Sequence, residues 1–336
     1  MALQTLLRAT AFRSPLLRTV VPTVALAYGI QTAVAIPSIA AETEQYYDLS
    51  GSLTYLSCTA LSLALPYLRA RSAGNFAGGL SEYLSATGPG QAGWWWRHVV
   101  LSAGVGIWAT RLGSYLFARI TSDGHDSRFD RIRSAPSKFY VAFFAQATWV
   151  SLCLLPVMLT NSLPRSAFAL SRLQNVAPAA IPQPVSANPY WTDILGVSLF
   201  LFGFIFEVLA DRQKSQWSKE KKEKKHSEEF LTRGLWSKSR HPNYFGEITL
   251  WTGIAVAAGG LLVRGPAQAG LGLGGGILGK ATVLGMCAAS PGFVTFLLTK
   301  ISGIPLSEGK YDKKYGDRKD YQKWKRETPV LVPKLF

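Results

Sequence analysis

The sequence predicts an all-α protein, a polytopic integral membrane bundle of about seven transmembrane helices. Of its 336 residues, 48% are hydrophobic and only 17% are charged, and the mean hydropathy is +0.13. Soluble globular domains carry about 25% charged residues, so this chain has too little polar surface for a soluble fold. A lipid bilayer around long apolar helices explains the difference.

Seven stretches are long and apolar enough to be spans, because a transmembrane helix needs roughly 20 predominantly apolar residues. They are residues 19–41, 49–68, 98–118, 139–161, 190–210, 244–263 and 281–299. Proline occurs in several of them, which membrane helices tolerate when neighbouring groups satisfy the freed backbone. Each stretch is therefore predicted to be a helix, and the segments between them are predicted to be loops at the membrane surfaces.

The net charge of +16 is concentrated in residues 119–138, 211–243 and 300–336, which together supply +12 of it. All three segments lie between or after predicted spans. The positive-inside rule therefore predicts that they are cytoplasmic loops and a cytoplasmic tail. The lipid bilayer is the expected partner of such a chain, and no nucleic-acid partner is expected.

Residues 1–18 form a separate basic segment, with Arg8, Arg13 and Arg18 and no acidic residue before Glu42. We interpret it as a basic tail before the first span, and a mitochondrial presequence is the alternative. Seven spans would place this tail outside, which fits its charge poorly. The endoplasmic reticulum is the expected membrane, with a mitochondrial membrane as the alternative, and the oligomeric state is left open.

No metal centre is expected. The three cysteines, Cys58, Cys153 and Cys287, all lie in apolar stretches, and the four histidines lack a metal-binding spacing such as HExxH. The glycine-rich run at 270–280 formally matches nucleotide-binding motifs. Because it joins two predicted spans and follows no strand, we interpret it as a turn.

Several ionisable residues lie at membrane depth, where a charge is costly unless it faces a polar cavity or a partner. Arg111 lies in the third predicted span. Glu207 and Asp211 are four residues apart on one helix face at the end of the fifth span, and Gln213 follows them. These residues are candidates for a substrate or cofactor site. The alternative is a structural ion pair between Glu207 and either Arg111 or Arg240.

The segment GLWSKSRHPNYFGE, residues 234–247, concentrates polar groups at the mouth of the sixth span. Arg240 offers paired donors that suit a phosphate or a carboxylate. Further donors and acceptors come from His241, Asn243, Tyr244 and Glu247. The cluster favours an anionic, hydroxyl-rich cofactor. Such a cofactor must carry any redox chemistry, because these side chains cannot.

With these residues the chain resembles the DUF1295 family, within the steroid 5-alpha-reductase-like superfamily of sterol C14 reductases and isoprenylcysteine carboxyl methyltransferases. The resemblance extends to four further blocks: TRLGSYLFARI (110–120), GHDSRFDRIR (124–133), GFIFEVLADRQK (203–214) and SGIPLSEGKYDKKYGDRKDYQKWKRETPVLVP (302–333). Residues 1–100 match only in pattern. We therefore expect N-terminal membrane helices over 19–100 and the family's membrane domain over 101–336.

The resemblance implies a cofactor cavity that opens to the cytosol between the helices. In the reductases the matching stretch contacts NADPH. This implies that Arg240 binds phosphate, and that the ribose and nicotinamide are lined by His241, Asn243, Tyr244 and Glu247. By their positions in the matching blocks, the resemblance also implies that the cofactor cavity is lined by Asp211, Gln213 and Trp236. Glu308 and Tyr315 would lie at the adenosine end.

The expected function is that of a reductase which transfers hydride from NADPH to an activated C=C of a sterol-like or fatty-acyl lipid. Tyr244 is the candidate proton donor, and the alternative for this residue is an interfacial aromatic at a helix end. Two other functions stay open. One is an S-adenosylmethionine-dependent membrane methyltransferase, and the other is a non-catalytic, lipid-binding member of the same fold.

Overall fold

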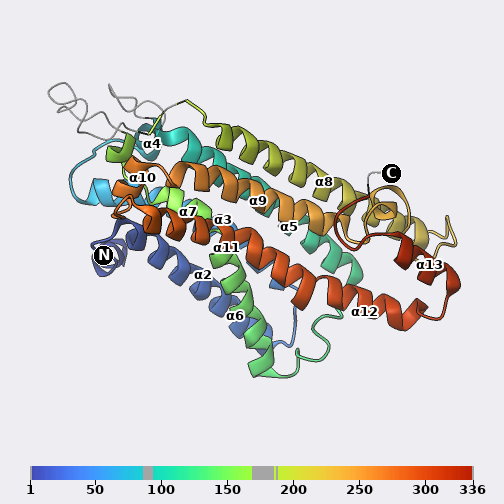
Figure 1. Ribbon diagram of the computed structural model, residues 1–336. Coiled ribbons are helices and arrows are strands. Elements are labelled where there is room, and N and C mark those ends of the chain that lie inside the picture. Colours follow the sequence, from blue (N-terminus) through green and yellow to red (C-terminus); the bar gives the residue numbers. More distant parts are fainter. Residues whose placement is uncertain (1, 86–93, 169–184, 187, 335–336) are drawn as a thin grey trace. The chain divides into compact units, whose positions relative to one another are not determined.

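The computed structural model describes residues 2–85, 94–168, 185–186 and 188–334 (Figure 1). Every regular element in this part of the chain is a helix, which confirms the all-α prediction. The longer helices are α2 (Pro15–Ala40), α3 (Tyr47–Ser72), α5 (Trp94–Asp123), α6 (Pro136–Cys153), α8 (Trp191–Lys222), α9 (Pro242–Leu262), α11 (Ile277–Phe296) and α12 (Ile304–Tyr315). The shorter ones are α1 (Ala2–Ala9), α4 (Leu80–Ser85), α7 (Leu155–Asn161), η1 (Arg165–Phe168), η3 (Gly234–Ser237), α10 (Gly265–Gly270), η4 (Leu297–Ile301) and α13 (Lys319–Glu327).

Apolar helices long enough to cross a membrane confirm the integral membrane class. Among the described residues there are five: Pro15–Ala40, Trp96–Asp123, Trp191–Lys222, Pro242–Leu262 and Ile277–Tyr315, and the pair α6 and α7 makes a sixth if it is one span. The predicted span 49–68 lies within α3, which is not one of them. Its buried face is rich in hydroxyl groups, including Ser50, Thr54 and Ser62, which lowers its hydropathy. The count of about seven stays a prediction.

The predicted span 139–161 is not one straight helix. It is divided into α6 and α7, whose axes differ by 51°. Pro156 lies in the first turn of α7. Proline has no N–H to donate to the carbonyl four residues earlier, and its ring crowds that carbonyl, so a continuous helix is broken there.

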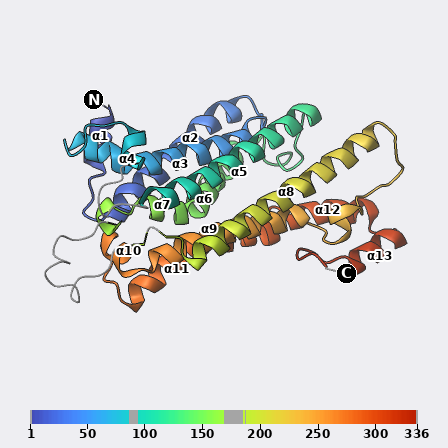
Figure 2. The same ribbon diagram turned by 90° about the horizontal axis from the view of Figure 1, so that it is seen from above.

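The chain forms two compact units: unit 1 is Met1–Ile194 and Ile254–Ser290, and unit 2 is Leu195–Gly253 and Pro291–Phe336. In unit 1, α2 packs against α3 and α6, and α3 packs against α5 (Figures 1 and 2). Polar side chains join these helices internally. Gln31 donates to the Thr54 hydroxyl at 2.8 Å, and Gln146 donates to the Ser50 hydroxyl at 3.2 Å. Such hydrogen bonds hold membrane helices together where lipid offers no hydrophobic driving force.

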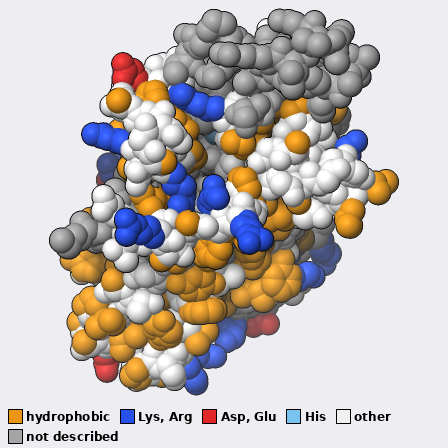
Figure 3. Space-filling model, turned by 90° about the vertical axis from the view of Figure 1, so that its left-hand side faces the viewer, with side chains coloured by type: hydrophobic (Ala, Val, Ile, Leu, Met, Phe, Trp, Pro, Cys, Tyr) orange, Lys and Arg blue, Asp and Glu red, His pale blue; other side chains and the backbone are white. Residues whose placement is uncertain are grey.

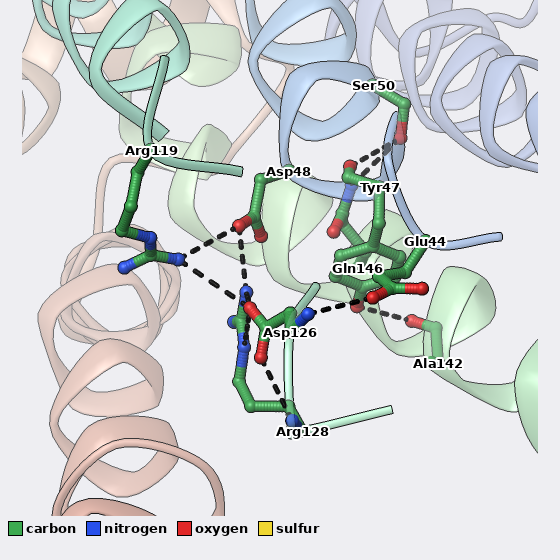
Figure 4. Close-up of polar contacts among 9 residues, drawn as sticks. All are labelled: Glu44, Tyr47, Asp48, Ser50, Arg119, Asp126, Arg128, Ala142 and Gln146. Atoms are coloured by element: carbon green, nitrogen blue, oxygen red, sulfur yellow. Dashed lines mark hydrogen bonds and ion pairs between the residues drawn. The ribbon is translucent and has the colours of Figure 1, made fainter. Parts of the chain in front are cut away.

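The two ends of this bundle differ in charge. The end where α1, α4 and α10 lie displays mainly Lys and Arg (Figure 3). At the other end, acids and bases balance in a network around the GHDSRFDRIR block (Figure 4). There Arg128 donates to Asp48 at 2.7 Å and to Asp126 at 2.9 Å, and Glu44 accepts from Arg133 at 2.6 Å. This block therefore ties the loop after α5 to the start of α3.

Unit 2 brings α8 and α9 into backbone contact through glycines. A Cβ atom at Gly203 would lie 2.6 Å from the Gly246 carbonyl oxygen and 2.5 Å from the Leu250 nitrogen. The segment before α9 is fixed by the C-terminal segment, because the Arg240 N–H donates to the Pro329 carbonyl at 2.9 Å. Together these contacts position Arg240 at the start of α9.

We expect the substitution Gly203→Ala to destabilise unit 2, because the added methyl group meets backbone atoms that cannot rotate away. Overpacking of this kind costs typically 1–3 kcal/mol, so about that loss is expected. Gly292→Ala is the matched control, because nothing lies within 4 Å of a Cβ atom there. Unfolding temperatures in detergent test this. Equal temperatures for the two variants would contradict the close helix contact.

Candidate cofactor pocket

A pocket in unit 2 lies between the end of α8, the segment before α9, and helices α12 and α13. Its empty volume, including its opening to solvent, is about 570 Å³. The lining residues are Lys214, Trp217, Ser218, Phe230, Leu231, Trp236, Arg240, His241, Ser307, Glu308, Tyr311, Tyr321 and Trp324.

Glu308 is the centre of the polar contacts in this pocket. Its carboxylate lies 3.1 Å from Arg240 Nη1, 3.1 Å from His241 Nε2 and 3.3 Å from Lys325 Nζ. Lys325 also binds Asp312 at 2.7 Å, which attaches α13 to α12. Glu308, the one acid in the described lining, is thus already paired with Arg240, His241 and Lys325. Within the described lining, Lys214 and Arg240 leave an excess of positive charge.

Two N–H donors that line the pocket have no acceptor. Arg240 Nε and Trp324 Nε1 are both buried and have no hydrogen-bond partner. The Arg240 side chain as a whole is only 9% exposed. Buried donors are almost always paired, and leaving one unpaired costs about 1–3 kcal/mol. A ligand that supplies hydrogen-bond acceptors would satisfy these two donors.

Aromatic rings form two walls of the pocket. One wall packs Trp217, Leu231 and Trp236 together, and Lys214 Nζ lies 5.2 Å from the centre of the Trp236 ring. The other wall is formed by Phe230, Tyr311, Tyr321 and Trp324, which pack in one cluster with Tyr315. Flat aromatic faces next to cationic groups suit a ligand with planar rings and negative charge.

Burial favours the neutral form of His241. Burial lowers the pKa of His241 below its usual value, and this outweighs the Glu308 carboxylate, which raises it. Its ring is parallel to that of Tyr244, with the ring centres 5.3 Å apart. A Cβ atom at Gly303 would lie 3.0 Å from the Tyr244 ring, so a glycine there leaves room for it. His241 thus connects Tyr244 to the pocket.

We expect the unfolding temperature to fall as the pH is lowered below about 6.5. The folded pKa of His241 lies below its unfolded value of 6.5, so in that window the unfolded chain binds more protons. The contribution of the neutral His241 to stability is therefore complete above about pH 6.5, and it is lost as the pH falls from there through the lower folded pKa. The variant His241→Gln should show a flatter dependence between neutral pH and about pH 5. The same slope in both proteins would contradict the buried neutral imidazole.

The structure brings Trp236, Arg240, His241 and Glu308 together as pocket lining. Other predicted residues in unit 2 surround it. Gln213 accepts from the Leu235 N–H at 2.9 Å, and Tyr315 donates to the Glu229 carbonyl at 3.0 Å. Tyr244, Asn243, Glu247, Asp211 and Glu207 lie in α8 and α9 but do not line the described pocket, and the last two are buried. Arg111 belongs to unit 1, where its guanidinium lies 5.3 Å from the Tyr115 ring.

Much of the aromatic lining was not predicted from the sequence, above all Trp217, Tyr321 and Trp324. A signal was present, because α13 has the sequence KDYQKWKRE, in which Tyr321 and Trp324 are three residues apart. That spacing places both rings on one face of a helix. Lys214 was also missed, although it ends the block that contains Asp211 and Gln213.

Comparison with known proteins agrees with the quoted blocks. The profile of a family described as a protein of unknown function, DUF1295, matches residues 79–265 and 276–328, which is most of the chain. No functionally curated protein and no solved structure matches the chain significantly. The chain therefore belongs to the DUF1295 family, which is part of the steroid 5-alpha reductase-like superfamily.

Proposed function

We propose that this membrane protein binds NADPH in the pocket of unit 2 and reduces an activated C=C of a sterol-like or fatty-acyl lipid. The observation that carries the proposal is the pair of buried donors without acceptors, Arg240 Nε and Trp324 Nε1. The phosphates and ring nitrogens of NADPH are acceptors of the kind that these groups lack. The aromatic walls of the pocket support a planar adenine ring between them.

Charge favours NADPH over S-adenosylmethionine. Lys214 and Arg240 line the pocket, and its single described acid, Glu308, is compensated by Arg240, His241 and Lys325. An excess of positive charge stabilises phosphates and repels the sulfonium of S-adenosylmethionine. The methyltransferase alternative is therefore the weaker one at this site.

The residues of the chain would divide the work. When bound, NADPH would supply the hydride, and Arg240 and Lys214 would hold its negative charge. Tyr244, which stacks on His241 beside the pocket, donates the proton that completes reduction of the double bond. The apolar helices keep the lipid substrate in the bilayer. The endoplasmic reticulum is the membrane that we propose.

The test is cofactor binding by the detergent-purified full chain, with NADPH and S-adenosylmethionine compared by calorimetry. We expect saturable binding of NADPH, followed by its oxidation when lipids with a conjugated enone are added. Binding of S-adenosylmethionine alone would overturn the reductase proposal. Binding of neither cofactor by folded protein would favour a non-catalytic lipid-binding role.

We expect Arg240→Ala to weaken NADPH binding by about 10- to 100-fold, because a hydrogen bond to a charged group contributes about 1.5–3 kcal/mol. The fold should survive, because Glu308 keeps His241 and Lys325 as partners. Arg212→Ala is the matched control, since Arg212 is exposed on α8 and does not line the described pocket. Calorimetry and unfolding temperatures measure both effects.

Glu308→Gln separates the two cofactors by the sign of its effect. Removing a negative charge from the pocket should tighten the binding of an anionic dinucleotide and weaken that of a cationic sulfonium compound. We therefore expect a lower Kd for NADPH in this variant. A higher Kd for NADPH would show that Glu308 contacts the cofactor directly, as the family resemblance suggests for the adenosine end.

A further inference from the structure

One end of unit 1 collects guanidinium groups from segments that are far apart in the sequence. Arg69, near the end of α3, donates to the carbonyl oxygens of Leu7, Thr10 and Arg18 at 2.9, 3.0 and 2.9 Å. It also donates to the Thr10 hydroxyl at 2.8 Å. These four contacts hold the N-terminal segment, with its three arginines, against α3.

The same end continues through α4, η1 and α10. The Arg165 guanidinium of η1 lies 3.9 Å from the centre of the Tyr83 ring in α4. A Cβ atom at Gly270 of α10 would lie 3.1 Å from the Ala167 side chain, so α10 packs directly on η1. Arg264 is the N-cap residue of α10. The cations of all these segments therefore share one face of unit 1 (Figure 3).

Acidic residues do not balance this charge. In the described parts of segments 2–18, 69–97, 165–193 and 264–280 there are nine Lys and Arg and two acids, of which Asp193 is bonded to Arg97. Burial and the charge of Arg18 lower the pKa of Arg69, as expected where guanidinium groups repel one another. The basic patch consists of the exposed cations Arg8, Arg13, Arg18, Arg71, Arg264 and Lys280.

Exposed apolar side chains accompany the basic patch. Leu6 and Leu17 are each 40% exposed beside its arginines, and Ile277 and Leu278, just before Lys280, are 88% and 79% exposed. Large apolar side chains that alternate with long cationic ones are typical of the zone where acyl chains meet headgroups. If only water surrounded them, the exposure of the Ile277 and Leu278 side chains would be unfavourable.

We propose that the basic patch binds the headgroups of anionic phospholipids. Lipid phosphates accept hydrogen bonds from the exposed guanidinium groups, and the neighbouring leucine and isoleucine side chains contact the upper acyl chains. The patch uses no residue that lines the cofactor pocket, so the inference is independent of the proposed reductase function. The proposal also places the N-terminal arginines of the folded protein at the lipid headgroups.

The test compares lipids with the full-length protein after delipidation in detergent. Phosphatidylglycerol should raise its unfolding temperature more than phosphatidylcholine does, and native mass spectrometry should show retained phosphatidylglycerol. The variant R13Q/R18Q/R71Q should lose both the extra shift and the retained lipid. The variant R13K/R18K/R71K, which keeps the charge, should retain them.

The matched control K313Q/K319Q/K323Q removes three exposed cations from unit 2 and should behave as the wild type does. Equal loss of the lipid effect in both triple variants would overturn the proposal, because net charge and not the patch would then decide binding. Inorganic phosphate that reproduced the shift would also overturn it, since the site would then bind free anions. A glutamine variant that is as thermostable as wild type without lipid establishes that it is folded.

Discussion

Replacing Tyr244 by phenylalanine is expected to lower kcat of lipid reduction by about 10²–10⁴-fold and to leave the Kd for NADPH nearly unchanged. The reason is that hydride transfer to one carbon of a double bond needs a proton at the other. The Tyr244 hydroxyl is the candidate donor, and its ring is held by stacking on His241. Phenylalanine keeps the ring and removes only the acidic group, so the pocket itself stays intact.

Steady-state rates and NADPH binding, measured on the same preparation, separate catalysis from cofactor positioning. Tyr140→Phe is a suitable control, because Tyr140 is a partly exposed residue of unit 1 whose hydroxyl lies 3.1 Å from that of Thr32. A tyrosine donor also predicts that the upper limb of the pH–rate profile is absent in Tyr244→Phe. A variant with full activity would assign Tyr244 to the interfacial aromatic role and leave proton donation to another group.

The helical class was predictable from the sequence because lipid imposes a simple pattern. Each apolar stretch of about 20 residues must be a helix, since only a helix satisfies its own backbone in hydrocarbon. The same reasoning is weak for residues 49–68, where hydroxyl groups on the buried face of α3 reduce the apolar signal. It also cannot locate the break at Pro156, because membrane helices often accommodate a proline without one.

The candidate site was only partly predictable because its parts are distant in the chain. Arg240 and His241 stood out as unusual residues at the mouth of a span, and family resemblance pointed to Glu308. The contact among them depends on how α12 docks against the start of α9, which local spacing does not reveal. The spacing in α13 places Tyr321 and Trp324 on one face, but it does not show that α13 packs on α12 through Lys325 and Asp312, which brings Trp324 to the pocket. Long-range packing, unlike helical periodicity, leaves no short sequence signature.

A charged residue in a membrane-spanning helix can have a structural role, and Asp193 is such a case. Its carboxylate lies 2.8 Å from Arg97 Nη2, and the two side chains are 5% and 2% exposed. Arg97 also donates to the Ser186 and Asn188 carbonyls at 2.8 and 2.9 Å, and Asp193 accepts from the Tyr190 N–H at 2.8 Å. The pair therefore fastens the segment before α8 to the start of α5 within unit 1.

Asp193→Ala is accordingly expected to destabilise the protein by about 3–5 kcal/mol, because it leaves the Arg97 guanidinium buried without a counter-charge. Asp320→Ala is the matched control. Its ion pair with Arg318 is about half exposed on both sides, and such pairs contribute about 0–1 kcal/mol. Unfolding temperatures in detergent measure the difference between the two.

The double variant R97M/D193L distinguishes a lost ion pair from a lost contact surface. Replacing both charges by apolar groups removes the desolvation cost along with the attraction, so the double variant should be more stable than Asp193→Ala alone. Full recovery is not expected, because the Ser186 and Asn188 carbonyls also lose the Arg97 donor. If the double variant were the less stable of the two, the hydrogen bonds from Arg97 to the Ser186 and Asn188 carbonyls would outweigh the cost of burying its unpaired charge.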